Sequence, residues 1–165
     1  MQKPLFERLF CCSTRMIGYI SRMKTIVLVS KCLLGARCRW DGNALESNKL
    51  RDFSGFQVIA ICPEMAGGLP CPRRAAQIVS GDGFDVLDGK SSVLDIDGAD
   101  VTDNYLKGAQ ATLNEALAGG AEVAYLKENS PSCGVRVIER DGRKISGTGV
   151  TAALLRRHGI RLESV

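Results

Sequence analysis

The sequence lacks the features that mark several common classes of protein. No apolar run reaches the roughly 18 residues of a transmembrane helix, and no N-terminal stretch has the charged, apolar and small-residue regions of a secretory signal. Lys and Arg number 22 against 18 Asp and Glu, and neither sign forms a long block. Charge therefore gives little support to a nucleic-acid partner, and an anionic small molecule is as plausible. We expect a cytoplasmic protein with reduced thiols and no membrane partner.

The length of 165 residues suits one domain with a single core. The first 22 residues have mixed polarity and no strong period, whereas an apolar strand begins abruptly after Met23. We therefore expect residues 1–22 to be a disordered extension or the product of a misassigned start. A short amphipathic targeting arm is the alternative reading of this segment. Residues 23–165 are expected to form one α/β domain.

The apolar segments alternate between the strand pattern and the helical pattern. Residues 25–30, 57–62 and 121–127 are apolar on both faces, which is typical of strands in a parallel sheet. A helical period is clearest in the stretch 100–120, with Thr102 or Asp100 as the cap and Gly119 as the stop. A hairpin is expected around Asp141-Gly142, and a helix and a strand should follow over residues 151–158 and 160–164. This order predicts an α/β fold with a mainly parallel sheet flanked by helices and a small hairpin after the third main strand.

Three connecting segments carry weaker signals. Residues 44–53 are expected to form a short helix, and residues 84–96 two short strands around a turn. Proline and glycine in the segment 63–74 predict a loop.

Cysteine is abundant, and three cysteines have informative positions. The seven are Cys11, Cys12, Cys32, Cys38, Cys62, Cys71 and Cys133. Cys32, Cys62 and Cys133 each lie at or just beyond the end of a predicted parallel strand, and ligands bind at that edge of an open sheet. Three soft thiolates at one edge indicate a site for zinc, copper or an iron-sulfur cluster. Ordinary packing explains any one of them alone, but explains all three poorly.

Zinc and an iron-sulfur cluster ask for different additional ligands. The single histidine, His158, falls in the last predicted helix beside two arginines, where an exposed helix end is the simpler interpretation. Zinc would therefore need Cys38 or Cys71 as a fourth ligand. A cubane cluster held by three cysteines instead leaves one iron open to a substrate.

Four motifs, in this order, resemble those of a known family. They are SKCLLGARCRWDG (residues 30–42), CPEMAGGLPCPR (62–73), KENSPSCG (127–134) and GVTAALLRRHGI (149–160). The sequence resembles the family known as domain of unknown function 523, whose studied members include thiouracil desulfidases. The resemblance covers the chain from Met23 to Val165.

The resemblance implies a 4Fe-4S cluster and a reaction that replaces a C=S sulfur with oxygen without net redox change. Matched by motif, the ligands are Cys32, Cys62 and Cys133. Cys38 also matches a frequent family position and is a possible fourth thiol near the cluster. Cys71 stands where the family usually has another residue, so we leave it out.

The reaction also needs a group that moves protons and groups that hold the substrate. Glu64, two residues after Cys62, is the first candidate for the proton transfer, and a salt bridge to Arg73 or Arg74 is its alternative role. The other candidates combine hydroxyl, amide, carboxylate and guanidinium groups. They are Ser130 and Ser132 for catalysis, and Asn129, Glu128, Arg73, Asp41 and Arg39 for substrate binding or loop bracing.

The leading hypothesis is an iron-sulfur-dependent desulfidase that acts on a thiolated pyrimidine base, nucleoside or nucleotide and releases sulfide. Such a protein would depend on cluster-assembly machinery, and it could be a monomer or a dimer. The alternative is a non-catalytic module that binds zinc or a cluster as a redox sensor. Action on thiolated transfer RNA would require a larger basic face or a further domain, and the sequence shows neither.

Overall fold

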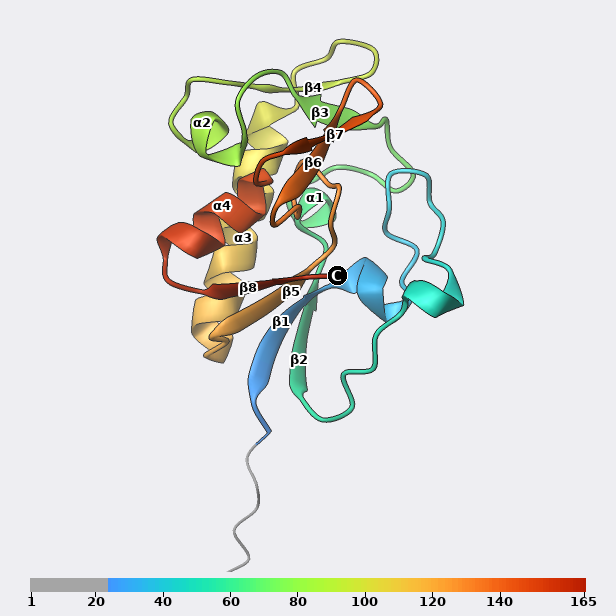
Figure 1. Cartoon of the computed structure of the whole chain (residues 1–165), viewed down its shortest axis with the longest axis vertical. Coiled ribbons are helices and arrows are strands. Elements are labelled where there is room, and N and C mark those ends of the chain that lie inside the picture. The colour runs from blue at the N-terminus through green and yellow to red at the C-terminus, as the bar shows by residue number, and fades with distance from the viewer. Residues whose placement is uncertain (1–23) are drawn as a thin grey trace, which may run out of the picture.

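The computed structural model describes residues 24–165 of the chain (Figure 1). The expected extension over residues 1–22, with Cys11 and Cys12, lies outside the described residues. Within the described part, none of the helices combines the length and the hydropathy of a membrane span.

A four-stranded parallel sheet forms the centre of the molecule. Its strands are β1 (Ile26–Ser30), β2 (Gln57–Ile61), β5 (Val123–Leu126) and β8 (Arg161–Ser164), in the order β2-β1-β5-β8. The two central strands, β1 and β5, consist mainly of β-branched and other apolar residues because both faces of the sheet are covered there. From β1 the chain first adds β2 on one side and then β5 on the other, so the order reverses between β1 and β5. In open α/β sheets, the crevice at the carboxyl end of such a switch point binds ligands.

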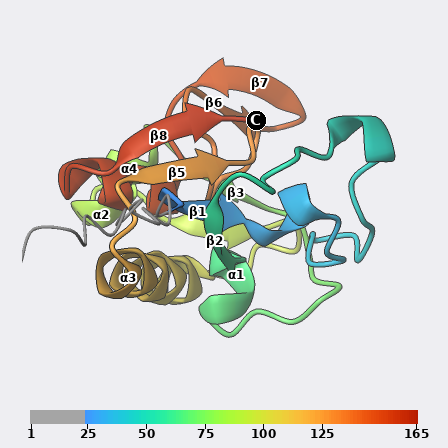
Figure 2. The same ribbon diagram turned by 90° about the horizontal axis from the view of Figure 1, so that it is seen from below.

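The two faces of the sheet are covered differently, as Figure 2 shows. Helices α3 (Thr102–Gly119) and α4 (Val150–Arg157) cover one face, where their apolar residues pack on Leu28, Ala124 and Leu126. The connection between β1 and β2 covers part of the other face. It contains the 3-10 turns η1 (Lys31–Leu34) and η2 (Ser47–Lys49), and packs Leu33, Cys38, Leu45 and Phe53 on Val27 and Val29.

Two small antiparallel pairs lie beyond the carboxyl edge of the sheet (Figure 1). Strand β3 (Ala76–Ile78) pairs with β4 (Val93–Asp95), and β6 (Val137–Arg140) pairs with β7 (Arg143–Ser146). A third apolar cluster joins both pairs to α3 and α4. The predicted α/β class, the parallel sheet and the hairpin after β5 are therefore confirmed.

The prediction of a helix over residues 44–53 is wrong. The structure has only the three-residue turn η2 there, and residues 46–52 are exposed. A helix this short is stable only when one face packs on the core, and this stretch offers no apolar face.

The strands expected over residues 84–96 are also partly wrong, because helix α2 (Gly83–Leu87) takes the place of the first. Asp82 accepts a hydrogen bond from Phe84 N (2.9 Å) and Asp85 accepts one from Asp82 N (3.0 Å), so two acids form a capping box. Likewise, residues 63–74 include helix α1 (Pro63–Ala66), which Pro63 begins.

Helix α1 lies so close to α3 that neither can carry a larger residue at the contact. A Cβ atom added at Gly108 would overlap the carbonyl oxygen of Pro63, and one added at Gly67 would overlap that of Asn104. Asn104 also donates from Nδ2 to the Gly67 carbonyl at 2.8 Å. This approach fixes α1 and the residues at its start, Cys62 and Glu64.

Replacing Gly108 by alanine should therefore destabilise the protein. Overpacking against backbone costs about 1 to 3 kcal/mol, so we expect the temperature of thermal unfolding of Gly108→Ala to fall by several degrees. Gly55→Ala is the matched control, because a Cβ atom there meets nothing within 4 Å. Equal unfolding temperatures for the two variants would contradict the packing of α1 on α3.

Candidate functional site

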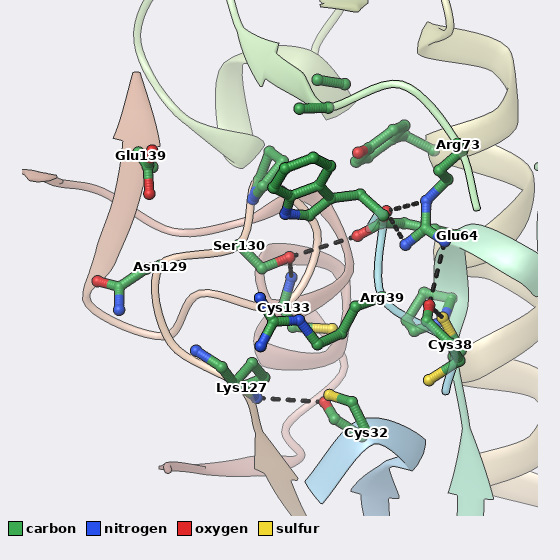
Figure 3. A pocket seen from close by; sticks show the side chains of 18 of the residues that line it. Cys32, Cys38, Arg39, Glu64, Arg73, Lys127, Asn129, Ser130, Cys133 and Glu139 are labelled. Carbon is green, nitrogen blue, oxygen red and sulfur yellow. Dashed lines mark hydrogen bonds and ion pairs between the residues drawn. The ribbon is translucent and has the colours of Figure 1, made fainter. Parts of the chain in front are cut away.

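A cavity of about 390 Å³ opens at the carboxyl edge of the parallel sheet, near the switch point between β1 and β5. Its wall combines the ends of β1, β2 and β5 with residues of α1, α3 and the hairpin. Figure 3 shows cysteine sulfurs, charged side chains and Ser130 gathered around it.

Four cysteines line this cavity, and each is positioned by a different part of the chain. Cys32 lies in the turn after β1, Cys62 follows β2 and precedes α1, and Cys133 lies in the turn after β5. Cys38 comes from the connection between β1 and β2. All four are free thiols; Cys62 is half-buried and the other three are buried. The structure thus brings together the three cysteines expected at the strand ends, and adds Cys38.

Contacts among these thiols show how close some of them lie. The neighbouring Cys32 thiol is the main reason why the pKa of Cys38 is raised to about 11. The pKa of Cys62 is raised well above its usual value, mainly by a hydrogen bond with Cys38 and secondarily by burial. Burial raises the pKa of Cys133 to about 12. A bound metal supplies the positive charge that keeps such thiols deprotonated, so binding releases their protons.

This donor set fits an iron-sulfur cluster. Thiolates are the usual ligands of such clusters, and four cysteine thiols share one cavity wall. Within residues 24–165, no three Cys, His, Asp or Glu side chains are grouped so that they could hold a metal ion. A cluster of several irons is wider than one ion, so its ligands do not need the close spacing that a single metal ion requires.

An ion pair between Glu64 and Arg73 lies beside the thiols (Figure 3). Arg73 donates from Nε to Glu64 Oε2 at 2.6 Å, and the two side chains are only 6% (Arg73) and 13% (Glu64) exposed. Arg73 also donates from Nη1 to the Cys38 carbonyl at 3.1 Å. The other carboxylate oxygen, Oε1, makes a long contact of 3.5 Å with Ser130 Oγ. The ion pair expected as the alternative role of Glu64 is therefore present, and it holds the carboxylate against the cavity.

Side chains fix the turn that carries Cys133. Ser130 Oγ accepts hydrogen bonds from the backbone N–H groups of Ser132 and Cys133, each at 3.1 Å. Glu128 accepts from Val135 N at 3.1 Å and also from the two residues that follow. Asn129 has a left-handed backbone, with φ of 63°, which asparagine tolerates better than most residues. Ser130, Glu128 and Asn129 all line the cavity.

Two of the expected site residues are placed elsewhere. Ser132 is 1% exposed and its hydroxyl pairs with Thr151 Oγ1 at 2.9 Å, under the turn. Asp41 pairs with Arg39 at 3.1 Å and accepts from Asn43 N, so it braces a loop. Neither is among the described residues of the cavity wall, whereas Arg39 and Arg73 are.

The positions of Cys71 and His158 can also be compared with what the sequence predicts. Cys71 is absent from the described cavity wall, and its thiol contacts the carbonyls of Arg37 (3.2 Å) and Arg39 (3.4 Å). His158 is exposed at the end of α4, as the sequence predicts.

The cavity wall also holds residues to which the sequence assigned no role. Lys127 donates from Nζ to the Glu128 carbonyl at 2.8 Å, and burial lowers its pKa. Tyr105 comes from α3, and burial raises its pKa well above the usual value. The signal for Lys127 was its place at the head of the motif after β5. Tyr105 carried no signal, because it belongs to the apolar face of a helix.

Comparison with known proteins agrees with these motifs. The sequence model of the 2-thiouracil desulfurase family matches residues 27–164. The uncharacterized protein YbbK of Bacillus subtilis (strain 168) is 43% identical over 143 residues, which cover 84% of this chain and 95% of that protein. The solved structure of the 4Fe-4S-dependent thiouracil desulfidase TudS is 41% identical, with a TM-score of 0.73 over 86% of this chain and 91% of TudS. The resemblance seen in the four motifs is thereby confirmed, and the chain belongs to the 2-thiouracil desulfurase family.

Proposed function

We propose that this protein removes the thiocarbonyl sulfur of 2-thiouracil or a closely related thiolated pyrimidine, with a 4Fe-4S cluster as cofactor. The observation that carries the proposal is the gathering of four cysteines in one cavity, at the edge of the sheet where ligands bind. The family match and the similarity to TudS support both the reaction and the cofactor.

Cys32, Cys62 and Cys133 would hold the cluster, because they extend from the ends of three neighbouring parallel strands. When bound there, the cluster would supply a Lewis-acidic iron with an affinity for sulfur. Cys38 is a further thiol at the same wall, available as a relay for the sulfur or as packing around the cofactor.

The reaction adds water to the thiocarbonyl carbon and expels the sulfur. The water oxygen becomes the carbonyl oxygen, and the two water protons leave with the sulfur as hydrogen sulfide, so no electrons are gained or lost. Glu64 would accept a proton from the attacking water at Oε1, the oxygen that Arg73 leaves free. Arg73 holds the carboxylate in place while that proton moves.

The residues after β5 would hold the pyrimidine. Asn129 has both a donor and an acceptor for the ring edge, and Ser130 has a hydroxyl beside Glu64. Glu128 is occupied by backbone N–H groups, so its role is to shape the turn. Ser132, beneath the same turn, would support it rather than touch substrate.

Arg39, whose side chain is 32% exposed, brings positive charge to the wall and suits a substrate carrying an anionic group, whereas Arg73 is neutralised by Glu64. Asp41 would act through Arg39, by fixing the position of its guanidinium. A protein that works with reduced thiols and an iron-sulfur cluster belongs in the cytoplasm, where cluster-assembly proteins would be its partners.

Anaerobic turnover in ¹⁸O-labelled water tests the reaction. With 2-thiouracil and no electron donor, we expect labelled uracil and sulfide in equal amounts. A requirement for a reductant, or unlabelled uracil, would contradict water addition without redox change.

Ser130 and Ser132 provide a matched pair of variants. Ser130→Ala removes the hydroxyl that accepts from two backbone N–H groups and faces Glu64, so we expect kcat to fall about tenfold or more. Ser132→Ala removes the buried contact with Thr151 and a hydrogen bond to the Cys133 thiol, and should lower the unfolding temperature with a much smaller loss of kcat than Ser130→Ala. Equal losses of kcat in both variants would contradict the assignment of Ser130.

A further inference from the structure

One aromatic side chain in the cavity wall has no packing role that explains it. Trp40 is 50% exposed, and it is the single tryptophan of the chain. Most of the other aromatic side chains in the described part are tied into packing: Phe53, Phe56 and Tyr125 pack on one another, and Tyr105 is buried. Trp40 instead lines the same cavity as the four cysteines.

The backbone around Trp40 is held in place from both sides. Its carbonyl accepts a hydrogen bond from Arg73 N at 2.8 Å, and Gly42 N donates to the Arg39 carbonyl at 3.0 Å. The Arg39–Asp41 ion pair closes the turn on its other side. Arg73 also pairs with Glu64, so the loop of Trp40 is fixed relative to that carboxylate. The indole is therefore presented to the cavity from a braced turn.

The apolar surface of this wall fits a flat ring. Ile96, which is 67% exposed, lines the cavity as well, so two large apolar side chains that are open to solvent share its wall. Much of the rest of the wall is thiol, charged or hydroxyl. An indole attracts planar heteroaromatic rings by stacking, and this attraction does not depend on the pattern of hydrogen-bond donors and acceptors.

We propose that Trp40 is the stacking surface for the substrate ring, and that it makes the site select planar pyrimidines over ring-saturated thiocarbonyl compounds. This inference rests on the proposed desulfidase function and deepens it. Trp40 binds and orients the ring, while Glu64 and Ser130 act at its reacting edge.

Two pairs of compounds separate the effect of ring stacking from the effect of hydrogen bonds at the ring edge. Uracil and 5,6-dihydrouracil carry the same carbonyl and N–H groups, but only uracil is aromatic and flat; 2-thiouracil and its 5,6-dihydro form differ in the same way. The reconstituted protein is compared with Trp40→Phe and Trp40→Leu, which are both tolerable at a half-exposed position. Calorimetry measures the binding of uracil and dihydrouracil, and steady-state kinetics measures KM and kcat for the two thiocarbonyl compounds.

We expect the wild-type protein to bind uracil about tenfold more tightly than dihydrouracil, and Trp40→Leu to lose this preference. For 2-thiouracil, Trp40→Leu should raise KM about tenfold with a much smaller change in kcat, and Trp40→Phe should recover most of the loss. The fluorescence of Trp40, the sole tryptophan, should change when uracil is added to the wild-type protein.

The outcomes separate this inference from the proposed function. Turnover of 2-thiouracil by the wild type, together with an unchanged ring preference in Trp40→Leu, would overturn the stacking role alone. No turnover and no binding of uracil by the wild type would overturn both.

Discussion

Changing Cys62 to serine should abolish binding of the cluster and turnover together. Cys62 lies at the junction of β2 and α1, and the packing of α1 on α3 fixes its position. A serine hydroxyl there is a hard and weakly acidic ligand that does not replace a thiolate on iron. We expect the iron content per chain and the brown colour typical of an iron-sulfur protein to fall to background. The formation of uracil from 2-thiouracil should fall with them.

The same result is expected for Cys32→Ser and Cys133→Ser, since each would remove one of three ligands. Cys71→Ser is the matched control, because Cys71 is absent from the described cavity wall and its thiol contacts the backbone carbonyls of Arg37 and Arg39. Cys38→Ser should keep the iron, because the proposed ligand set is complete without it. Iron measured by absorption at visible wavelengths and by elemental analysis checks all five variants. Full iron content after any of the three ligand changes would refute that cysteine as a ligand.

Changing Glu64 to glutamine should keep the cluster and remove most of the turnover. Glutamine has the size of glutamate but cannot accept a proton, and general acid-base groups contribute about 10²- to 10⁴-fold to a rate. We therefore expect kcat for 2-thiouracil to fall by at least about 100-fold, with iron per chain unchanged.

This change also leaves Arg73 buried without its partner, so its effect on stability has to be measured separately. Breaking a buried ion pair costs about 3 kcal/mol, which would appear as a lower unfolding temperature. Glu139→Gln is the control, since Glu139 lines the same cavity but is exposed. If Glu64→Gln turns over as fast as Glu139→Gln, Glu64 has no part in proton transfer and serves only to hold Arg73.

The sequence was informative wherever a long-range pattern determined the structure. The apolar runs before Cys32, Cys62 and Cys133 predict parallel strands, and the rule that ligands bind at strand ends predicts that these cysteines meet. The structure places all three in one cavity wall. The fold class and the hairpin followed from the same alternation of apolar and turn-forming segments.

The sequence was less informative where local contacts decide. Helix α2 depends on the reciprocal hydrogen bonds of Asp82 and Asp85. The sequence alone predicts a strand there because the composition of this stretch is typical of strands. The sequence does not distinguish the roles of Ser130 and Ser132. The geometry of the turn directs Ser130 towards Glu64 and places Ser132 beneath the turn, where it pairs with Thr151. Trp40 looked like part of a motif, and its exposure in the cavity wall appears only in three dimensions.

The content of iron and acid-labile sulfide per chain, measured after anaerobic reconstitution, tests the central claim most directly. We expect about four of each per chain, held by Cys32, Cys62 and Cys133 in the cavity wall. Zinc in place of iron, or a protein that retains no metal, would contradict it.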